Sequence, residues 1–220
     1  MIAEGGTEYG HKVVIARSKN IFGPYESNPD NPILTHANSN AEASPIQGVG
    51  HADMVQTEDG SWFMVMLGFR PLDSHQHLGR ETFLAPVEWK ENQFPVVNKN
   101  GTIALEMKVD KLPEAVKVKD FSQNEDFSKE KLGFEWNYIN NPNLQNYSLF
   151  ERKGFLRLWG SEQSLSQYPN VTFVGRRLQH FDFSAETTLD FNPKSDNEEA
   201  GLTIYRDANH HYKLSVKNEK

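Results

Sequence analysis

The apolar segments of this 220-residue chain are short, rich in β-branched and aromatic side chains, and bounded by Gly, Pro, Asn or Asp. Runs of this kind are typical of β-strands separated by turns. No window keeps a helical period over several turns, and the one candidate, residues 112–116, is too short to form a stable helix. The sequence therefore predicts an all-β fold.

Turn and strand signals alternate through the first hundred residues. The segment Glu58-Asp-Gly60 predicts the turn of a hairpin. Residues 26–47 contain Asn28-Pro-Asp-Asn-Pro32 and few apolar side chains, so we expect a long surface loop there. The strands predicted in this part cover residues 12–17, 53–57, 61–66, 83–89 and 94–97.

A domain boundary is predicted between about Lys108 and Asn124. This stretch is charged, weakly patterned and interrupted by Pro113, as linkers tend to be. We therefore divide the chain into a first domain at 1–110, a linker at 111–123 and a second domain at 124–220.

Beyond the linker, alternating apolar segments recur at regular intervals. They predict antiparallel sheets packed face to face, each with one solvent-exposed face. The chain opens on a strand without a leader and stops shortly after another strand, so we expect it to be truncated at both ends. The strands predicted in this part cover residues 155–159, 171–174, 181–191, 200–205 and 212–216.

Composition excludes several classes of function. Acidic residues outnumber basic ones by 30 to 23, which argues against nucleic-acid binding. The chain has no cysteine, which excludes disulfides, thiolate metal sites and a cysteine nucleophile. No apolar stretch is long enough to cross a membrane, and the opening residues lack the features of a signal peptide. These features do not indicate a cellular compartment.

Polar side chains stand at the ends of two strongly apolar runs. His51 lies in Gly48-Val-Gly-His-Ala-Asp53, and Arg80 follows the run Trp62–Gly68 in Leu78-Gly-Arg-Glu-Thr82. Polar groups held there by a rigid β scaffold are suited to gripping small ligands rich in hydroxyl groups.

The order of several short motifs resembles that of glycoside hydrolase family 43, in particular its β-xylosidase-like branch. The likeness covers essentially the whole chain. The first motifs are Ala3–Tyr25, Gly50-His-Ala52, Gly60-Ser-Trp62, Leu78–Thr82 and Val87-Glu-Trp89, and the later ones are Asp126-Phe-Ser128, Leu132–Asn137 and Ala200–Tyr205.

This resemblance implies a partial five-bladed β-propeller followed by a partial concanavalin-like β-sandwich. It also implies an inverting exo-glycosidase that removes terminal xylose or arabinose from hemicellulose oligosaccharides. Such an enzyme needs an acid and a base carboxylate on opposite sides of the sugar. By the family pattern, the base Asp, a second Asp and the acid Glu all precede Ala3, so this chain holds no catalytic residue and is expected to be inactive alone.

Three substrate-binding residues follow from the motifs of the family. Thr7 lines the pocket floor, Arg80 donates to sugar hydroxyls and His51 lies near the propeller axis. The partner is then a xylo- or arabino-oligosaccharide, and no cofactor is required. In some relatives the equivalent histidine is the only protein ligand of a hydrated calcium, which implies a candidate structural calcium near His51.

Each of these residues also has an ordinary structural interpretation. His51 could be a satisfied, partly buried histidine, Arg80 could form a surface ion pair with Glu81, and Thr7 is at home in any strand. Two carboxylates, Glu4 and Asp53, are better explained by a tight turn and by edge charge than by catalysis.

The histidine pairs and aromatic residues of the chain favour structural roles as well. His75 with His77 and His210 with His211 lack a third ligand nearby, so metal sites are not expected. The alternating aromatic residues of the second domain are interpreted as sandwich core rather than as a sugar platform. They are Trp136, Phe155, Trp159, Phe181 and Phe183.

Two other functional interpretations remain at this point. The chain could be a non-catalytic carbohydrate-binding β protein that uses its sandwich as a lectin. It could also be a truncated piece that misfolds, because propeller blades depend on their neighbours.

Overall fold

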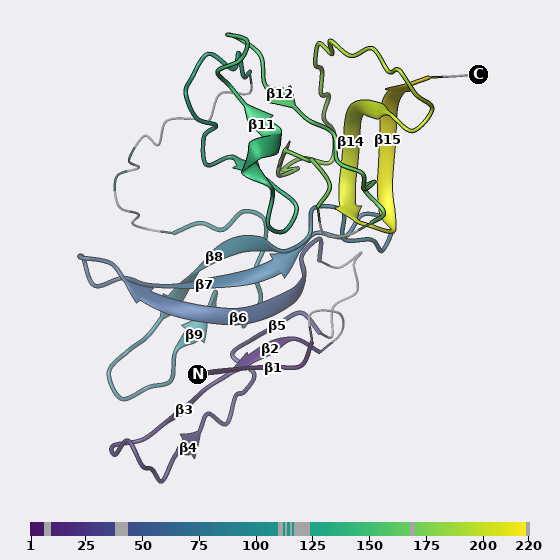
Figure 1. The fold of residues 1–220 in the computed structure, drawn as a ribbon. Coiled ribbons are helices and arrows are strands. Elements are labelled where there is room, and N and C mark those ends of the chain that lie inside the picture. Colours follow the sequence, from purple (N-terminus) through teal and green to yellow (C-terminus); the bar gives the residue numbers. More distant parts are fainter. Residues whose placement is uncertain are drawn as a thin grey trace. The chain divides into compact units, whose positions relative to one another are not determined.

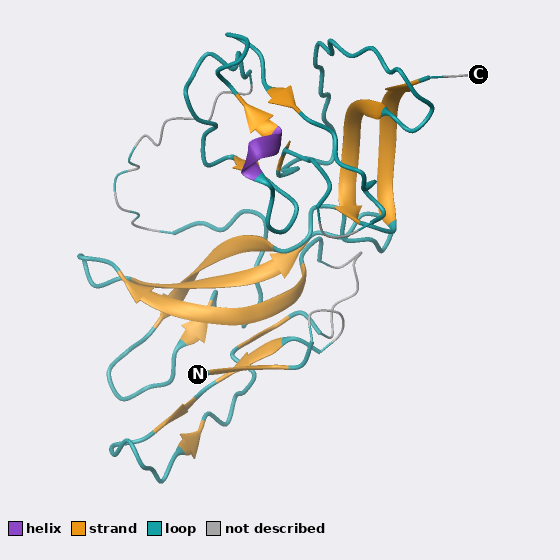
Figure 2. Cartoon of the chain, in the orientation of Figure 1, coloured by secondary structure: helices purple, strands orange, loops and turns teal. Residues whose placement is uncertain are grey.

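The computed structural model describes residues 1–6, 10–37, 44–109, 112, 114, 116, 124–167 and 170–218. The regular structure within these ranges is β-strand, apart from the short 3-10 helix η1 (Leu144–Asn146) (Figure 1) (Figure 2). The all-β prediction is confirmed. In this part of the chain, no helix is long and apolar enough to cross a bilayer. The chain divides into two compact units, Met1–Lys117 and Val118–Lys220.

The first unit contains a four-stranded antiparallel meander (Figure 1). A sheet of this kind is the repeating blade of a β-propeller. The hairpin predicted at Glu58-Asp-Gly60 is present, because Gln56 pairs with Trp62 and Gly60 takes a φ of 85°. The four strands are β6 (Gln47–Gln56), β7 (Trp62–Phe69), β8 (Glu81–Glu88) and β9 (Val96–Val97).

Shorter strands precede this blade. The strands β1 (Ile2–Glu4), β2 (Lys12–Val14) and β5 (Leu34–Thr35) form a three-stranded antiparallel sheet. A separate pair is formed by β3 (Ala16–Arg17) and β4 (Glu26–Ser27). Strand β2 also contacts β6 (Figure 1), so the two sheets lie against each other.

The core of the first unit joins these two sheets. Met64 and Met66 alternate along β7 and belong to one buried cluster with Val13 of β2 and Leu34 of β5. Burying a side chain of this size contributes about 1.5–3 kcal/mol. The buried members of the cluster are Val13, Ile33, Leu34, Ile46, Val49, Met64, Met66, Ala85, Val87, Val97 and Ile103.

The expectation of a surface loop at residues 26–47 is wrong for part of that segment. Ile33, Leu34 and Ile46 are buried in the core, and Leu34 begins strand β5. Asn31 explains how a polar stretch reaches the interior. Its side-chain amide accepts from the Ile15 N–H and donates to the Ile15 carbonyl, both at 2.9 Å, so it takes the place of a neighbouring strand.

The described residues of the second unit form three two-stranded antiparallel pairs. Strands β14 and β15 contain the strands predicted at 200–205 and 212–216. The strands predicted at 171–174 and 181–191 are wrong, since these residues belong to no ladder. The pairs are β10 (Trp136–Asn137) with β13 (Gly175–Arg176), β11 (Tyr147–Ser148) with β12 (Arg157–Leu158), and β14 (Glu199–Asp207) with β15 (His210–Lys217).

Packing in the second unit is looser than in the first. No side chain is buried among residues 124–167 and 170–218. Polar contacts hold the segments together instead. The Tyr147 hydroxyl donates to the Phe173 carbonyl and accepts from the Phe173 N–H, both at 2.9 Å.

Candidate functional site

His51 lies on an irregular part of β6. The pairing of β6 with β7 shifts between Gln47 and Gly50 and again between Gly50 and Asp53, and each shift inserts one extra residue into β6. Bulges of this kind occur next to functional sites, where they change the direction in which a side chain points. The irregularity therefore distinguishes this part of β6 from the regular ladder that continues through Gln56.

The backbone of His51 is strained. Its φ is 50°, in the left-handed region, and its side chain is exposed. A residue with a side chain is destabilised by about 1–2 kcal/mol in this conformation relative to glycine. Such strain is retained mainly where surrounding structure imposes it, and it collects at binding sites. The interpretation of His51 as a satisfied, partly buried histidine does not fit this exposed position.

Arg80 is exposed and precedes β8 at the end of the connection from β7. The base of this connection is closed by a forked ion pair, because Arg70 donates to both Glu81 oxygens at distances of 2.8–3.2 Å. The hydrogen bonds that Arg70 donates to Glu81 are the main cause that raises the pKa of Arg70 above its ordinary value, and burial opposes them. The ion-pair partner of Glu81 is thus Arg70.

The ladder relates the positions of His51 and Arg80 along the blade. Gly50, Leu67 and Thr82 form one cross-strand row. His51 follows this row by one residue and Arg80 precedes it by two. Ordinary strand spacings then put their Cα atoms roughly 14 Å apart, too far for direct contact between the side chains.

Thr7, the third predicted site residue, lies outside the described residues. Gly5 has a φ of 70°, and a Cβ there would lie 2.1 Å from the Gly10 carbonyl oxygen. A side chain at position 5 would therefore clash with the Gly10 carbonyl, which gives Gly5 a structural role. Glu4 pairs with Lys12 across β1 and β2 at 3.4 Å, which is a structural role.

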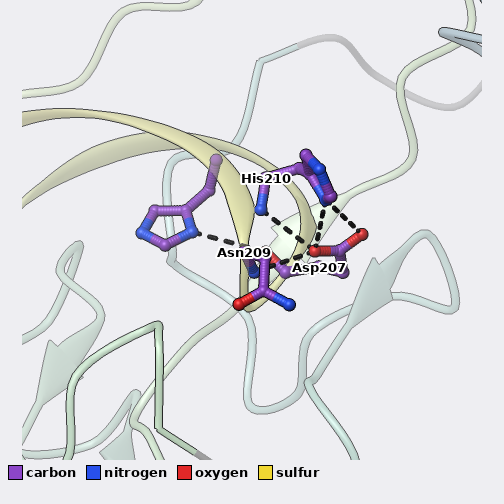
Figure 3. A network of polar contacts seen from close by, with 4 residues as sticks. Asp207, Asn209 and His210 are labelled. Carbon is purple, nitrogen blue, oxygen red and sulfur yellow. Dashed lines mark hydrogen bonds and ion pairs between the residues drawn. The ribbon is translucent and has the colours of Figure 1, made fainter.

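The histidine pairs are part of turns. Figure 3 shows the turn between β14 and β15, where one Asp207 oxygen accepts from the Asn209 N–H, the His210 N–H and His210 Nδ1 at 2.8–3.0 Å. These hydrogen bonds, the one from His210 first, lower the pKa of Asp207. In the other pair, His75 Nδ1 donates to the Asp73 carbonyl.

The described residues do not form a protein-held calcium site. They contain no group of three or more His, Cys, Asp or Glu side chains placed to hold a metal ion. Calcium takes six to eight oxygen ligands. A hydrated calcium that has His51 as its only protein ligand stays a prediction from the family resemblance.

The aromatic side chains of the second unit do not form the predicted core. Trp159 and Phe183 are 38% and 47% exposed, and the other three are half-buried. Guanidinium groups lie over three of the rings, at 3.7–5.8 Å from the centroids. These rings are Trp136, Phe155 and Trp159.

Sequence reasoning missed two residues that support the site. Arg70 forms the fork with Glu81, and His11 is buried against β6. The glycines around His51 gave a signal for His11, because Gly50 lacks a side chain at the place where the His11 ring lies.

The propeller blade and the short antiparallel pairs that follow it define an all-β protein of two units. The sequence model of "Glycosyl hydrolases family 43" matches residues 1–95. The model described as "Beta xylosidase C-terminal Concanavalin A-like domain" matches residues 124–220. The chain belongs to glycoside hydrolase family 43, and its fold is a partial five-bladed propeller followed by a partial concanavalin-like sandwich.

Two relatives illustrate the extent of the match. The chain is 44% identical over 217 residues to a non-reducing end alpha-L-arabinofuranosidase of Bacteroides ovatus, covering 98% of this chain and 40% of the relative. It is 33% identical to a beta-xylosidase of Bacillus subtilis, covering 100% and 43%. The chain thus spans about two fifths of the length of these relatives.

Solved structures also match this chain. The structure titled "Bacteroides ovatus Xyloglucan PUL GH43B" matches with a TM-score of 0.88 and 41% identity, covering 99% of this chain and 43% of that one. A xylan beta-1,4-xylosidase from Bacillus halodurans matches with a TM-score of 0.84 and 33% identity, covering 97% and 41%. These matches do not favour a free-standing carbohydrate-binding protein.

Proposed function

We propose that this chain is part of an inverting exo-glycosidase that releases terminal xylose or arabinose from hemicellulose oligosaccharides. The observation that carries the proposal is the match to the B. ovatus arabinofuranosidase over 98% of this chain at 44% identity. The B. subtilis beta-xylosidase matches over the same range. The two names differ in the sugar, so both xylose and arabinose belong to the proposal.

In this proposal the chain binds the sugar and does not supply the reacting carboxylates. An inverting reaction needs an acid and a base roughly 6.5–9.5 Å apart across the sugar. Glu4 forms an ion pair with Lys12, and Asp53 lies within the β6–β7 ladder opposite Val65. The catalytic carboxylates would then lie on the part of the enzyme that corresponds to the rest of the relatives' length.

Arg80, His51 and Thr7 are the proposed sugar contacts. A guanidinium has a rigid fork of donors that can hold two adjacent hydroxyl groups. The exposed imidazole of His51 adds a donor or an acceptor about 14 Å away along the blade. A sugar residue between the two would be gripped from both sides.

We also propose the domain limits that follow from the sequence. Residues 1–110 would form the late part of the propeller, 111–123 the linker and 124–220 the incomplete sandwich. The division into compact units at Lys117 and the family matches ending at 95 and starting at 124 support this arrangement.

Sugar binding can be tested on the chain itself by saturation-transfer NMR with methyl β-D-xylopyranoside and methyl α-L-arabinofuranoside. We expect a signal that Arg80→Ala and His51→Ala remove. Arg206→Ala, which changes an exposed arginine on β14, serves as the control and should leave the signal intact. Equal signals for all three variants would contradict the proposed contacts.

Turnover gives the second test. The purified chain should not hydrolyse aryl xylosides or aryl arabinofuranosides, because it lacks an acid and base pair. Hydrolysis that is lost on Glu4→Gln or Asp53→Asn would show that the reacting carboxylates are in this chain and would overturn the proposal.

A further inference from the structure

His11 is a buried histidine that directly precedes β2. Its side chain is 7% exposed, and its Nδ1 lies 2.9 Å from the Gly48 carbonyl oxygen on β6. A carbonyl accepts and does not donate, so Nδ1 carries the proton of this hydrogen bond. The Thr35 hydroxyl donates to the His11 carbonyl at 3.0 Å, which fixes the backbone of His11 to β5.

The carbonyl that His11 binds belongs to the irregular part of β6. The β6–β7 ladder pairs Gln47 and then Gly50, and it omits Gly48. A buried carbonyl without a ladder partner costs free energy unless another donor replaces the strand. The imidazole of His11 is this donor.

The ring of His11 also occupies the space beside Gly50. A Cβ at Gly50 would lie 2.5 Å from Cε1 and 2.6 Å from both ring nitrogens of His11. Only a residue without a side chain can stand there while the ring is in place. The edge of the imidazole ring therefore packs against the backbone of Gly50, immediately before His51.

We propose that His11 is a positioning residue that holds the bulged segment Gly48–His51 and thereby presents His51. This inference rests on the proposed function, in which His51 contacts the sugar. The hydrogen bond from His11 holds the Gly48 carbonyl at one end of the segment, and the edge of the ring packs against Gly50. The left-handed backbone of His51 follows directly after Gly50, so the contacts of His11 maintain the strain.

A simple core role for the ring would not require the donor. Leucine has a similar size and no hydrogen-bond donor, whereas the asparagine amide places an N–H close to the position of Nδ1. The variants His11→Leu and His11→Asn therefore separate packing from positioning.

The readout is the backbone of residue 51 in the isotopically labelled chain. The one-bond Cα–Hα coupling is smaller for residues with positive φ, so it reports the strained conformation directly. We expect His11→Leu to raise this coupling to the value of an ordinary strand residue. His11→Asn should restore the wild-type value.

An unchanged coupling in His11→Leu, with only a lower melting temperature, would overturn the inference and leave His11 as a core residue. If His11→Leu does not fold, His11→Gln provides the same comparison, because its longer side chain moves the amide away from the Gly48 carbonyl. An unchanged coupling there would equally overturn the inference.

Sugar binding separates this inference from the proposed function. We expect His11→Leu to lose as much saturation-transfer signal as His51→Ala. If the coupling of residue 51 changes while His51→Ala still binds the sugar, the positioning role stands and the sugar contact of His51 fails. If His51→Ala loses the sugar while His11→Leu keeps the wild-type coupling, the proposed function stands and the positioning role fails.

Discussion

Strands β7 and β15 are both eight residues long, and each pairs with a neighbour in an antiparallel ladder. Their burial differs greatly. Met64 on β7 is fully buried, whereas Tyr212 and Leu214 on β15 are 80% and 76% exposed. Strand β7 lies in the middle of a four-stranded sheet that contacts a second sheet, and β15 belongs to a two-stranded ribbon.

The comparison shows that an apolar pattern forms strands but does not by itself form a core. A two-stranded ribbon is marginally stable in water unless another layer covers its apolar face. In the described part of the second unit no such layer is present, and the buried indole N–H of Trp136 finds no acceptor there. Stability should therefore be concentrated in the first unit.

The largest expected effect is that of Met64→Ala. Removing this fully buried side chain should lower the free energy of unfolding of the first unit by about 2–5 kcal/mol. The matched change Leu214→Ala should alter stability by less than about 0.5 kcal/mol, because the side chain is exposed.

Urea unfolding followed by tryptophan fluorescence measures the two units separately. The four tryptophans divide evenly, with Trp62 and Trp89 in the first unit and Trp136 and Trp159 in the second. Changing either pair to Phe leaves reporters in the other unit alone. Similar losses for Met64→Ala and Leu214→Ala would break the comparison.

Ion pairs provide a second, smaller contrast. The side chains of Arg70 and Glu81 are 29% and 24% exposed and form a fork, so Glu81→Gln should cost about 1–3 kcal/mol. Arg152 and Asp190 form an exposed pair in the second unit, and Asp190→Asn should cost about 0–1 kcal/mol.

Thermal unfolding at low and high salt tests this contrast. The exposed pair should lose its contribution as salt rises, while the half-buried fork should keep most of its own. Equal salt sensitivity of Glu81→Gln and Asp190→Asn would show that the fork is as well solvated as the surface pair.

Backbone strain gives a third contrast. His51 in the packed unit and Asn140 in the second unit have φ values of 50° and 51°. Glycine relieves the strain of His51 but adds freedom to the unfolded chain, so His51→Gly should raise stability by about 0–1 kcal/mol. Asn140→Gly should be neutral, because asparagine tolerates this conformation. A loss above about 1 kcal/mol for His51→Gly in urea unfolding would mean that its side chain stabilises the blade.

Local signals predicted the fold where the ladder is regular. The Asp-Gly turn and the apolar runs around it predicted the hairpin and the neighbouring strands, whereas the propeller blade was predicted from the family resemblance. The same signals failed at Ile33 and Leu34, which are buried. The preceding Asn31 makes strand-like hydrogen bonds that no composition rule anticipates. These signals also failed at 181–191, since a strand needs a neighbouring strand and the sequence does not say which segment supplies it.

The sequence predicted which residues form the candidate site, but not how they are arranged. His51 and Arg80 came from their motifs, and the structure adds their exposure. The bulge that presents His51 and the fork beside Arg80 depend on His11 and Arg70, which lie 40 and 10 residues away along the chain. Contacts over such separations are set by the packing of sheets, which a single sequence does not reveal.

The smallest expected effect concerns pH. The pKa of Asp207 is lower in the folded chain than its ordinary value of 3.8, mainly because His210 donates to its carboxylate. Its stabilising contribution is therefore complete above the unfolded pKa and is lost as the pH falls through the lower folded value. In the first unit, the hydrogen bond from Arg17 lowers the pKa of Glu26 in the same direction.

Both carboxylates are exposed, so the melting temperature should change little with either titration. The response of the nearby backbone amides should differ between the two carboxylates. Asp207 accepts from the backbone N–H groups of Asn209 and His210, and these two amide resonances should move together as the pH falls below 3.8. Asp207→Asn should abolish this shared movement, while Glu26→Gln should leave it unchanged. If the two amides titrate independently in the wild-type chain, the turn in the second unit is not organised by this carboxylate, and the ladder of β14 and β15 alone holds it.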